Sequence, residues 1–243
     1  MLEDLTSLDS LGYEALKKAL NQRVVVNRVR ILPSNVNRVW LVETDVRPIV
    51  VKKFLSRKSG TEFETLIRAR AAGLTVPFPL WKEGDYMVLE YIHGETCDRM
   101  INYMFSAEVA EMLGAWLGGF HGRLDGSGAK MIVGDAALSN FIFSEGAVYG
   151  VDLEDSREGE PLEDVGDLAA SILGSEPFFT PIKFDLCFRM IRAYERSTGV
   201  DAIERVRPYI AKHLRIDAKK KPLFRRTLVG ASKSLERGWP RLA

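Results

Sequence analysis

The sequence predicts an α+β protein with two lobes, and three observations lead to that prediction. Three segments rich in Val, Ile and Leu lie between residues 23 and 54, and the turns between them are too short for crossover helices. They are therefore expected to form an antiparallel sheet. Beyond residue 106, apolar residues recur mainly at helical spacing. The 243 residues suffice for two lobes of about 100 residues each, which we expect at 1–92 and 93–243.

The first lobe is expected to be an antiparallel sheet with accompanying helices. Apolar residues at helical spacing predict an amphipathic helix over 1–20. A second helix is expected at 59–73, because Gly73 is a residue type that commonly ends helices. The strands are expected at 23–32, 37–44, 47–54, 78–82 and 86–91.

The second lobe is expected to be mostly helical after a single-stranded hinge near 91–95. Residues 106–123 have the composition of a buried helix, and 163 onward is mostly helical. Two short strands, 140–143 and 147–152, are joined by a Glu-Gly turn, which predicts a hairpin. A cleft between two such lobes is where a ligand is expected.

The composition argues against several classes of protein. The chain is 46% hydrophobic with a net charge of +1, so a large field that gathers nucleic acid or membrane is not expected. No apolar run reaches the roughly 18 residues of a membrane-spanning helix, and the acidic N-terminus is unlike a signal peptide. Two cysteines and three histidines are too few for a disulfide framework or a structural metal cluster. We therefore expect a cytoplasmic protein.

The charge is unevenly distributed. Residues 201–243 contain twelve Lys or Arg and four Asp or Glu, a net charge of +8, so the first 200 residues carry −7. Such a tail is suited to contact RNA or an acidic protein partner. A solvated amphipathic helix explains the same pattern and is the favoured interpretation.

The segment 131–155 contains the residue types that phosphoryl transfer requires. Asp135 and Asn140 are five residues apart in a loop, and Asp152 ends the predicted hairpin, which can bring it back beside Asn140. Carboxylate and amide oxygens are the hard ligands that Mg²⁺ prefers, and a second carboxylate is then free to accept a proton. The alternative is that Asp135 and Asn140 simply stabilise turns, which is common for these residue types.

A lysine in the first lobe adds to this pattern. Lys52 lies within an otherwise apolar strand and points away from its neighbours, toward solvent or toward an anion. Glu62 or Glu64 on the following helix can hold it by an ion pair, and Lys53, on the opposite face, is the solvated alternative. A lysine, a glutamate and a phosphate in contact form the first-lobe half of an ATP site.

Over residues 23–175 the chain resembles the protein-kinase-like fold, and within it the aminoglycoside phosphotransferase and choline kinase superfamily. GDAALSN (134–140) is similar to the catalytic-loop pattern G-D-x-x-x-x-N, and GVDLED (150–155) to the metal-binding Asp segment. The other similar segments are PSNVNRVWLVET, IVVK, EFETLIRARAAGLTVPFPL and MVLEYIHGETC. Each motif is weak alone, but their order and spacing together are specific.

The resemblance implies a role for each matching residue. Lys52 would pair with the α- and β-phosphates of ATP, and Glu62 would anchor Lys52. Asp135 would be the catalytic base, while Asn140 and Asp152 would bind Mg²⁺. The implied nucleotide contacts are backbone groups of Glu90, Tyr91 and Ile92 at the adenine, with side chains of Ser34, Asn35 and Asn37 in place of a glycine-rich loop. Asp167 would brace the catalytic loop.

Two departures from the family pattern bear on turnover. Val133 stands where many relatives have His or Arg, and Ala137 stands where protein kinases have Lys. Both of the missing side chains help at the transferred phosphoryl group, so slow turnover is expected. Asp152 and Asp167 are only fifteen residues apart, which leaves no room for the activation segment of a regulated protein kinase.

These residues and the resemblance predict an ATP- and Mg²⁺-dependent phosphotransferase that acts on a hydroxyl of a small molecule. An atypical protein kinase or an ATPase of a tRNA-modification-type complex is the alternative, favoured by the compact size and the basic tail. A nucleotide-binding pseudokinase is the second alternative. The acidic run 154–164 is either a solvated loop or a surface that recognises a cationic acceptor.

Overall fold

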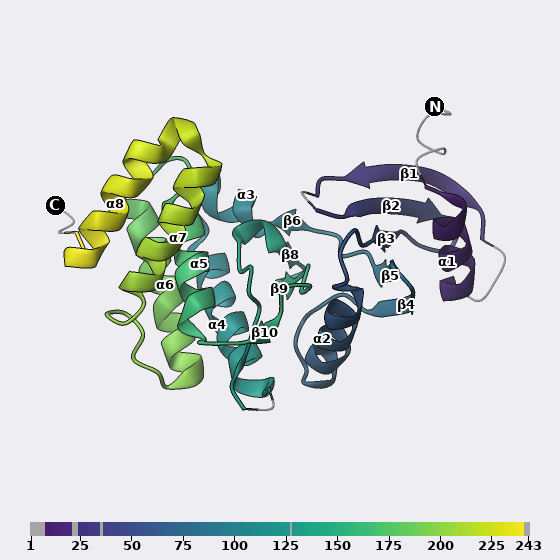
Figure 1. The fold of residues 1–243 in the computed structure, drawn as a ribbon, viewed down its shortest axis with the longest axis horizontal. Coiled ribbons are helices and arrows are strands. Elements are labelled where there is room, and N and C mark those ends of the chain that lie inside the picture. The colour runs from purple at the N-terminus through teal and green to yellow at the C-terminus, as the bar shows by residue number, and fades with distance from the viewer. Residues whose placement is uncertain (1–7, 21–23, 35, 127, 241–243) are drawn as a thin grey trace. The chain divides into compact units, whose positions relative to one another are not determined.

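The computed structural model describes residues 8–20, 24–34, 36–126 and 128–240 (Figure 1). The chain divides into two compact units, Met1–His93 with Asp152–Asp155, and Gly94–Val151 with Ser156–Ala243. The division falls one residue beyond the expected 92/93 boundary. The short segment 152–155 joins the first unit although its sequence neighbours belong to the second. The predicted α+β fold is confirmed.

The first unit contains a five-stranded antiparallel sheet with one helix on each face. The strand order is β1-β2-β3-β5-β4. The strands are β1 Val26–Leu32, β2 Arg38–Thr44, β3 Ile49–Lys53, β4 Pro79–Glu83 and β5 Tyr86–Glu90, and the helices are α1 Ser10–Leu20 and α2 Ser59–Ala71. All seven elements agree with those expected from the sequence to within a few residues, except that the expected first helix and first strand extend into 1–7 and 23, outside the described residues.

Strand alternation decides which residues face which helix. Ile49 and Val51 of β3 lie in the hydrophobic core that packs against Leu16 of α1. Since successive side chains of a strand point to opposite faces, Lys52 lies on the face away from α1. Its amine contacts Glu62 of α2 there. The sheet therefore separates an apolar layer from the layer that carries the charged residues.

Gly73 ends α2 in the manner expected. It has a φ of 75°, a left-handed conformation that glycine adopts without strain. Its N–H donates to the carbonyl of Arg70, and the next N–H, of Leu74, donates to the carbonyl of Ala69. This hydrogen-bond pair is the Schellman arrangement that closes many helices.

The second unit is mostly helical. Its helices are α3 Cys97–Asn102, α4 Ala107–Arg123, α5 Leu162–Leu173, α6 Pro181–Thr198, α7 Arg207–Lys220 and α8 Arg225–Arg237, with short 3₁₀ turns η1 Leu138–Asn140 and η2 Pro222–Phe224. The strands are β6 Glu95–Thr96, β7 Met131–Ile132, β8 Phe141–Ser144, β9 Ala147–Gly150 and β10 Arg157–Glu158. Four short elements, α3, β6, β7 and β10, were not predicted from the sequence, because they contain too few residues to show a helical or strand periodicity of apolar residues.

The helical core is held by close packing of α4 against α6. A Cβ at Gly114 would lie 2.0 Å from the carbonyl oxygen of Met190, so only glycine permits this approach of the two helices. The predicted β8–β9 hairpin forms, with Phe141 paired to Gly150. Its turn residues Glu145 and Gly146 both have positive φ, as a two-residue hairpin turn requires. None of the described helices is long and apolar enough to span a lipid bilayer.

A fully buried lysine connects three elements of the second unit. The amine of Lys183 on α6 donates to the side-chain oxygen of Asn102 at the end of α3 and to the hydroxyl of Ser175, 3.1 Å away, after α5. Among the described residues, no carboxylate forms an ion pair with it. Burial lowers the pKa of Lys183 to about 8, although Asp98 acts in the opposite direction.

This pKa predicts a pH-dependent stability. Because the folded pKa of Lys183 is below its ordinary value of 10.5, the unfolded chain binds the proton more tightly. The cost of the buried charge is therefore complete below the folded pKa and disappears as pH rises to the unfolded pKa. Urea denaturation gives the free energy of unfolding of the parent and of Lys183→Met. The parent value minus the variant value should increase by about 2 kcal/mol between about pH 7 and about pH 10. A difference that does not change with pH would contradict a lowered pKa of Lys183.

Candidate active site

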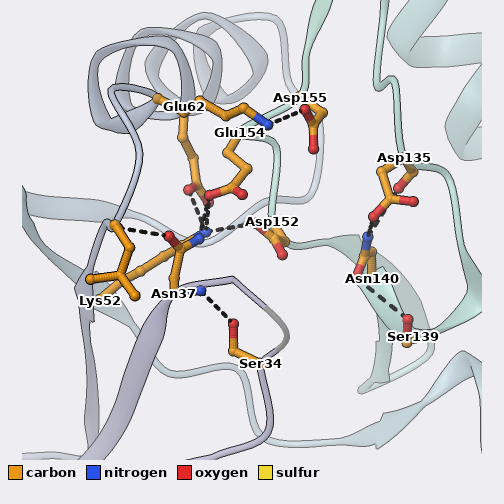
Figure 2. A network of polar contacts seen from close by, with 12 residues as sticks. Ser34, Asn37, Lys52, Glu62, Asp135, Ser139, Asn140, Asp152, Glu154 and Asp155 are labelled. Carbon is orange, nitrogen blue, oxygen red and sulfur yellow. Dashed lines mark hydrogen bonds and ion pairs between the residues drawn. The ribbon is translucent and has the colours of Figure 1, made fainter.

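Lys52 is the centre of a buried charged cluster in the first unit (Figure 2). Its Nζ lies 2.6 Å from a carboxylate oxygen of Glu62, 2.6 Å from one of Asp152 and 3.2 Å from one of Glu154. The side chain of Glu62 is 1% exposed and that of Glu154 is 6% exposed, whereas that of Asp152 is 41% exposed. One ammonium thus contacts two buried carboxylates and one that is accessible to solvent.

The cluster carries more negative than positive charge. Burial by itself would lower the pKa of Lys52, but the carboxylates of Glu62 and Asp152 outweigh it and raise that pKa well above its ordinary value. Burial raises the pKa of Glu62 to about 7, against the effect of Lys52. With three carboxylates around one ammonium, a further cation is electrostatically favourable at this place.

The two alternatives left open for this cluster have different positions. Glu64 is exposed on α2, and Glu62 is the glutamate that contacts Lys52. Lys53 points to the other face of the sheet, where its amine lies 2.8 Å from Asp9 and above the ring of Tyr86. Lys53 therefore attaches α1 to the sheet, and Lys52 is the strand lysine that faces the acidic residues.

Asp152 has an uncommon backbone conformation. Its φ is 61°, in the left-handed region that costs a non-glycine residue about 1 kcal/mol, although aspartate tolerates it better than most. The residue stands where the chain passes from β9 of the second unit into the segment 152–155 of the first. Local strain of this kind concentrates at functional sites.

Asp135 and Asn140 lie together in a loop of the second unit (Figure 2). The Asn140 amide nitrogen donates to the backbone oxygen of Asp135 and to its carboxylate, each at 3.0 Å. These two bonds fix the orientation of the amide and leave its oxygen with only a distant hydroxyl, that of Ser139 at 3.5 Å. The N–H of Val151 donates to the carbonyl of Asn140, and Asp152 is the next residue in the chain.

Helix α5 braces this loop with three side chains at helical spacing. Asp164 accepts from the N–H groups of Val133 and Gly134 at 2.6 and 2.9 Å. Asp167 accepts from the N–H of Ala136 at 3.0 Å, and the hydroxyl of Ser171 accepts from that of Leu138 at 3.2 Å. The backbone on both sides of Asp135 is therefore held by one rigid element.

Asp164 has further buried partners. Its carboxylate lies 2.9 Å from Nε2 of His121 on α4, and Nδ1 of His121 lies 3.2 Å from the hydroxyl of Tyr194 on α6. His121 is thus a buried structural hydrogen-bonding residue. The resemblance implied only Asp167 as a brace of this loop, and Asp164 was not predicted.

The expectation that the acidic run 154–164 is a solvated loop is wrong for two of its members. Glu154 and Asp164 are buried, and Asp155 and Glu163 form ion pairs with Lys58 and with Arg157 and Lys212. The helical spacing of Asp164 with Asp167 and Ser171 was the signal that could have identified Asp164. Nothing comparable in the local sequence distinguishes Glu154, because its partners are far away in the chain.

The residues predicted to contact the nucleotide differ in whether their hydrogen-bonding groups already have partners. The N–H of Glu90 already donates to the carbonyl of Phe78, so it is not free for adenine. The backbones of Tyr91 and Ile92 form no hydrogen bond to another described residue. Ser34 accepts from the N–H of Asn37 at 3.1 Å, and Asn35 lies outside the described residues.

Part of the basic tail, residues 201–243, packs within the second unit. Helices α7 and α8 fold back on each other, with Arg215 paired to Glu236 and Arg207 bonded to the carbonyl of Leu235. Arg225, Arg226 and Lys233 line a shallow groove on α8. The tail therefore contains both a packed face and an exposed basic face.

The residues present suit a hard divalent cation. In the second unit, the amide nitrogen of Asn140 is occupied by its bonds to Asp135, which leaves the amide oxygen, a donor of the kind that Mg²⁺ prefers. Glu62, Asp152 and Glu154 also bring carboxylate oxygens within 4.8 Å of one another. No described histidine or cysteine belongs to this group of potential ligands.

The bracing by α5 gives a stability prediction. Asp164→Ala would leave two buried N–H groups and His121 without an acceptor, and it should reduce the free energy of unfolding by about 3 kcal/mol. Asp167→Ala should cost less, about 1–2 kcal/mol, because Asp167 is partly exposed and holds one N–H and the ring nitrogen of His213, 2.9 Å away. Urea denaturation measures both values, and equal losses would contradict the assigned roles.

Comparison with known proteins supports the same interpretation of the fold. Residues 28–130 match the family model described as the phosphotransferase enzyme family, APH. No curated protein matches the chain in sequence.

Several solved structures have a similar fold at low sequence identity. Amicoumacin kinase hAmiN, in complex with AMP-PNP and Ca²⁺, is 12% identical, with a TM-score of 0.66 over 100% of this chain and 91% of the other. The ADP-bound aminoglycoside phosphotransferase APH(2'')-Ib is 14% identical, with a TM-score of 0.64 over 94% and 97% of the two chains. A choline/ethanolamine kinase family protein from Mesorhizobium loti is 16% identical, with a TM-score of 0.63 over 86% and 88%.

These similarities agree with the resemblance of the sequence to the aminoglycoside phosphotransferase and choline kinase superfamily. The sequence match covers most of the first unit and the beginning of the second, and the structural matches cover nearly the whole chain. The chain has a protein-kinase-like fold, which these kinase and phosphotransferase structures share, and its residues 28–130 match the phosphotransferase enzyme family.

Proposed function

We propose that this protein transfers the γ-phosphoryl group of ATP to a hydroxyl of a small molecule in a Mg²⁺-dependent reaction. The observation that carries the proposal is the buried contact of Lys52 with Glu62, beside the solvent-accessible carboxylate of Asp152. A lysine held by a helix glutamate, next to a carboxylate able to bind metal, is the first-unit half of a phosphoryl-transfer site. Asp135 and Asn140 supply the second-unit half.

In this proposal Lys52 pairs with the α- and β-phosphates, and its contact with Glu62 keeps the ammonium in one position. Asp152 and Asn140 would hold Mg²⁺, and a bound Mg²⁺ would supply positive charge to the phosphate oxygens. Asp152 suits this role because it is the most exposed of the three carboxylates at Lys52.

Asp135 is the general base in the proposal. The hydroxyl oxygen of the acceptor forms a bond to the γ-phosphorus, the bond from that phosphorus to the β–γ bridging oxygen breaks, and ADP leaves. The hydroxyl proton passes to the carboxylate of Asp135. The exposed position of Asp135 and the brace from α5 are consistent with a base that must meet its substrate from solvent in a fixed orientation.

The acceptor class is supported by the similar proteins. One is an amicoumacin kinase, and another structure is a gentamicin complex of an APH(2'')-IIa enzyme, so both similar proteins are described with a small molecule other than a nucleotide. A cationic acceptor remains part of the proposal. The exposed carboxylates of the acidic run that could attract it are Glu158 and Glu160, since Glu154 and Asp164 are buried.

The other two predicted functions become outcomes of one assay. The exposed basic face on α8 supports contact with RNA or an acidic protein, which fits a protein kinase or an ATPase within a complex. Val133 is buried and Ala137 precedes η1, so neither position offers a side chain to the phosphoryl group, which fits a pseudokinase. Neither has an observation as specific as the Lys52 cluster.

Substitution of the proposed base separates chemistry from binding. Asp135→Ala should reduce phosphoryl transfer by about 10²–10⁴-fold, because a general base contributes about that much, while ATP affinity stays close to that of the parent. Asp152→Ala should weaken Mg²⁺-dependent ATP binding as well. Calorimetry with MgATP and initial rates measure the two effects. If both variants turn over like the parent, these residues do not have the proposed roles.

The acceptor is found with γ-labelled ATP, Mg²⁺ and extract of the source cells, with Asp135→Ala as the matched control. We expect Asp135-dependent label in a compound that passes a size-cutoff filter. Label retained on protein would instead favour the protein kinase, and label only in free phosphate would favour the ATPase. Tight nucleotide binding without label above the control would favour the pseudokinase.

A further inference from the structure

A buried bond between Asn37 and Glu154 has no part in the function proposed so far. The amide nitrogen of Asn37 donates to Oε2 of Glu154 at 2.5 Å (Figure 2). Asn37 stands immediately before β2 and Glu154 lies 117 residues later. Both side chains are buried, so this bond connects two distant segments inside the first unit.

The same oxygen of Glu154 also faces the lysine. Oε2 lies 3.2 Å from Nζ of Lys52, so a single carboxylate oxygen receives the amide of Asn37 and the ammonium of Lys52. A carboxylate with two donors on one oxygen is fixed in direction. Asn37 therefore decides where Glu154 points, and Glu154 points at Lys52.

The exposure of the three carboxylates gives them different tasks. Asp152 is the proposed metal ligand, and its side chain is 41% exposed. A cation on Asp152 would weaken the contact of this carboxylate with Lys52, and Glu62 and Glu154 would remain as the buried partners of the ammonium. Glu154 thus keeps Lys52 in place at the stage at which the phosphates arrive.

Asn37 also connects this arrangement to Ser34 and to Leu55. Its backbone N–H donates to the hydroxyl of Ser34, and its side-chain oxygen accepts from the N–H of Leu55 at 3.2 Å. The backbone of Asn37 is thereby tied to Ser34, and its side chain joins the residues just after β3 to the segment 152–155.

We propose that Glu154 is a second buried anchor of Lys52 and that Asn37 is the positioning residue that orients Glu154. The inference rests on the proposed function, since it assumes that Lys52 contacts the nucleotide. Neither residue needs to touch the nucleotide or the metal. Their loss should appear as weaker nucleotide binding that depends on Lys52.

The test measures the dissociation constant of Mg²⁺–AMP-PNP by calorimetry on the full chain, with the unfolding midpoint of each variant in urea. This nucleotide probe needs no knowledge of the acceptor. Glu154→Gln keeps the size of the side chain and an oxygen for the Asn37 amide but removes the charge. Asn37→Asp keeps the oxygen for Leu55 but puts a second carboxylate against Glu154.

Each single variant should weaken binding about tenfold, the size expected for one lost charge-assisted contact. In a Lys52→Met background neither substitution should change the dissociation constant further. The matched control is Ser59→Ala, which removes another buried hydrogen bond of the first unit, to the carbonyl of Gly84. It should lower stability and leave the dissociation constant unchanged.

The double variant Asn37→Asp with Glu154→Gln separates positioning from a structural role. It restores a hydrogen bond between the two positions in the reverse direction, so stability should recover while nucleotide binding stays weak. Recovery of both stability and nucleotide binding in the double variant would overturn the inference. So would single variants that bind Mg²⁺–AMP-PNP as tightly as a parent that itself binds it. A parent that does not bind Mg²⁺–AMP-PNP would overturn the proposed function and this inference with it.

Discussion

The burial of one ammonium group among three carboxylates is the constraint on which the first unit depends. Lys52 cannot be buried without partners, because an unpaired charge in the interior costs several kcal/mol. The partners come from α2 through Glu62 and from the segment 152–155 through Asp152 and Glu154. This requirement explains why four residues group with the first unit although the chain on either side of them belongs to the second.

In the second unit, the corresponding constraint is the orientation of the exposed loop that contains Asp135. Asp135, the proposed base, is exposed, so burial does not fix its side chain. Instead the backbone around it is hydrogen-bonded to Asp164, Asp167 and Ser171 of α5, and α5 is embedded in the helical core. Rigid scaffolds that carry accessible reactive groups are the usual way in which a fold supplies orientation.

Features set by local chemistry were predictable from the sequence. Strand alternation placed Lys52 on the face opposite to its apolar neighbours, Gly73 was expected to end α2, and the Glu-Gly pair at 145–146 was expected to close the hairpin. Features set by distant contacts were not. Glu154 and Asp164 sit in a run that composition describes as solvated, yet Asn37 and His121 make their burial possible. The choice between Glu62 and Glu64 likewise needed the orientation of α2.

The central claim is that the contact between Lys52 and Asp152 breaks when the nucleotide binds. Lys52 then contacts the phosphates, and Asp152 binds the metal. A crystal structure with AMP-PNP and Mn²⁺ tests it most directly, because Mn²⁺ replaces Mg²⁺ and is located by anomalous scattering. The account predicts Nζ of Lys52 on the α- and β-phosphates, still bonded to Glu62, and Mn²⁺ bound by oxygens of Asp152 and Asn140. A nucleotide bound elsewhere, with Lys52 still bonded to all three carboxylates, would contradict it.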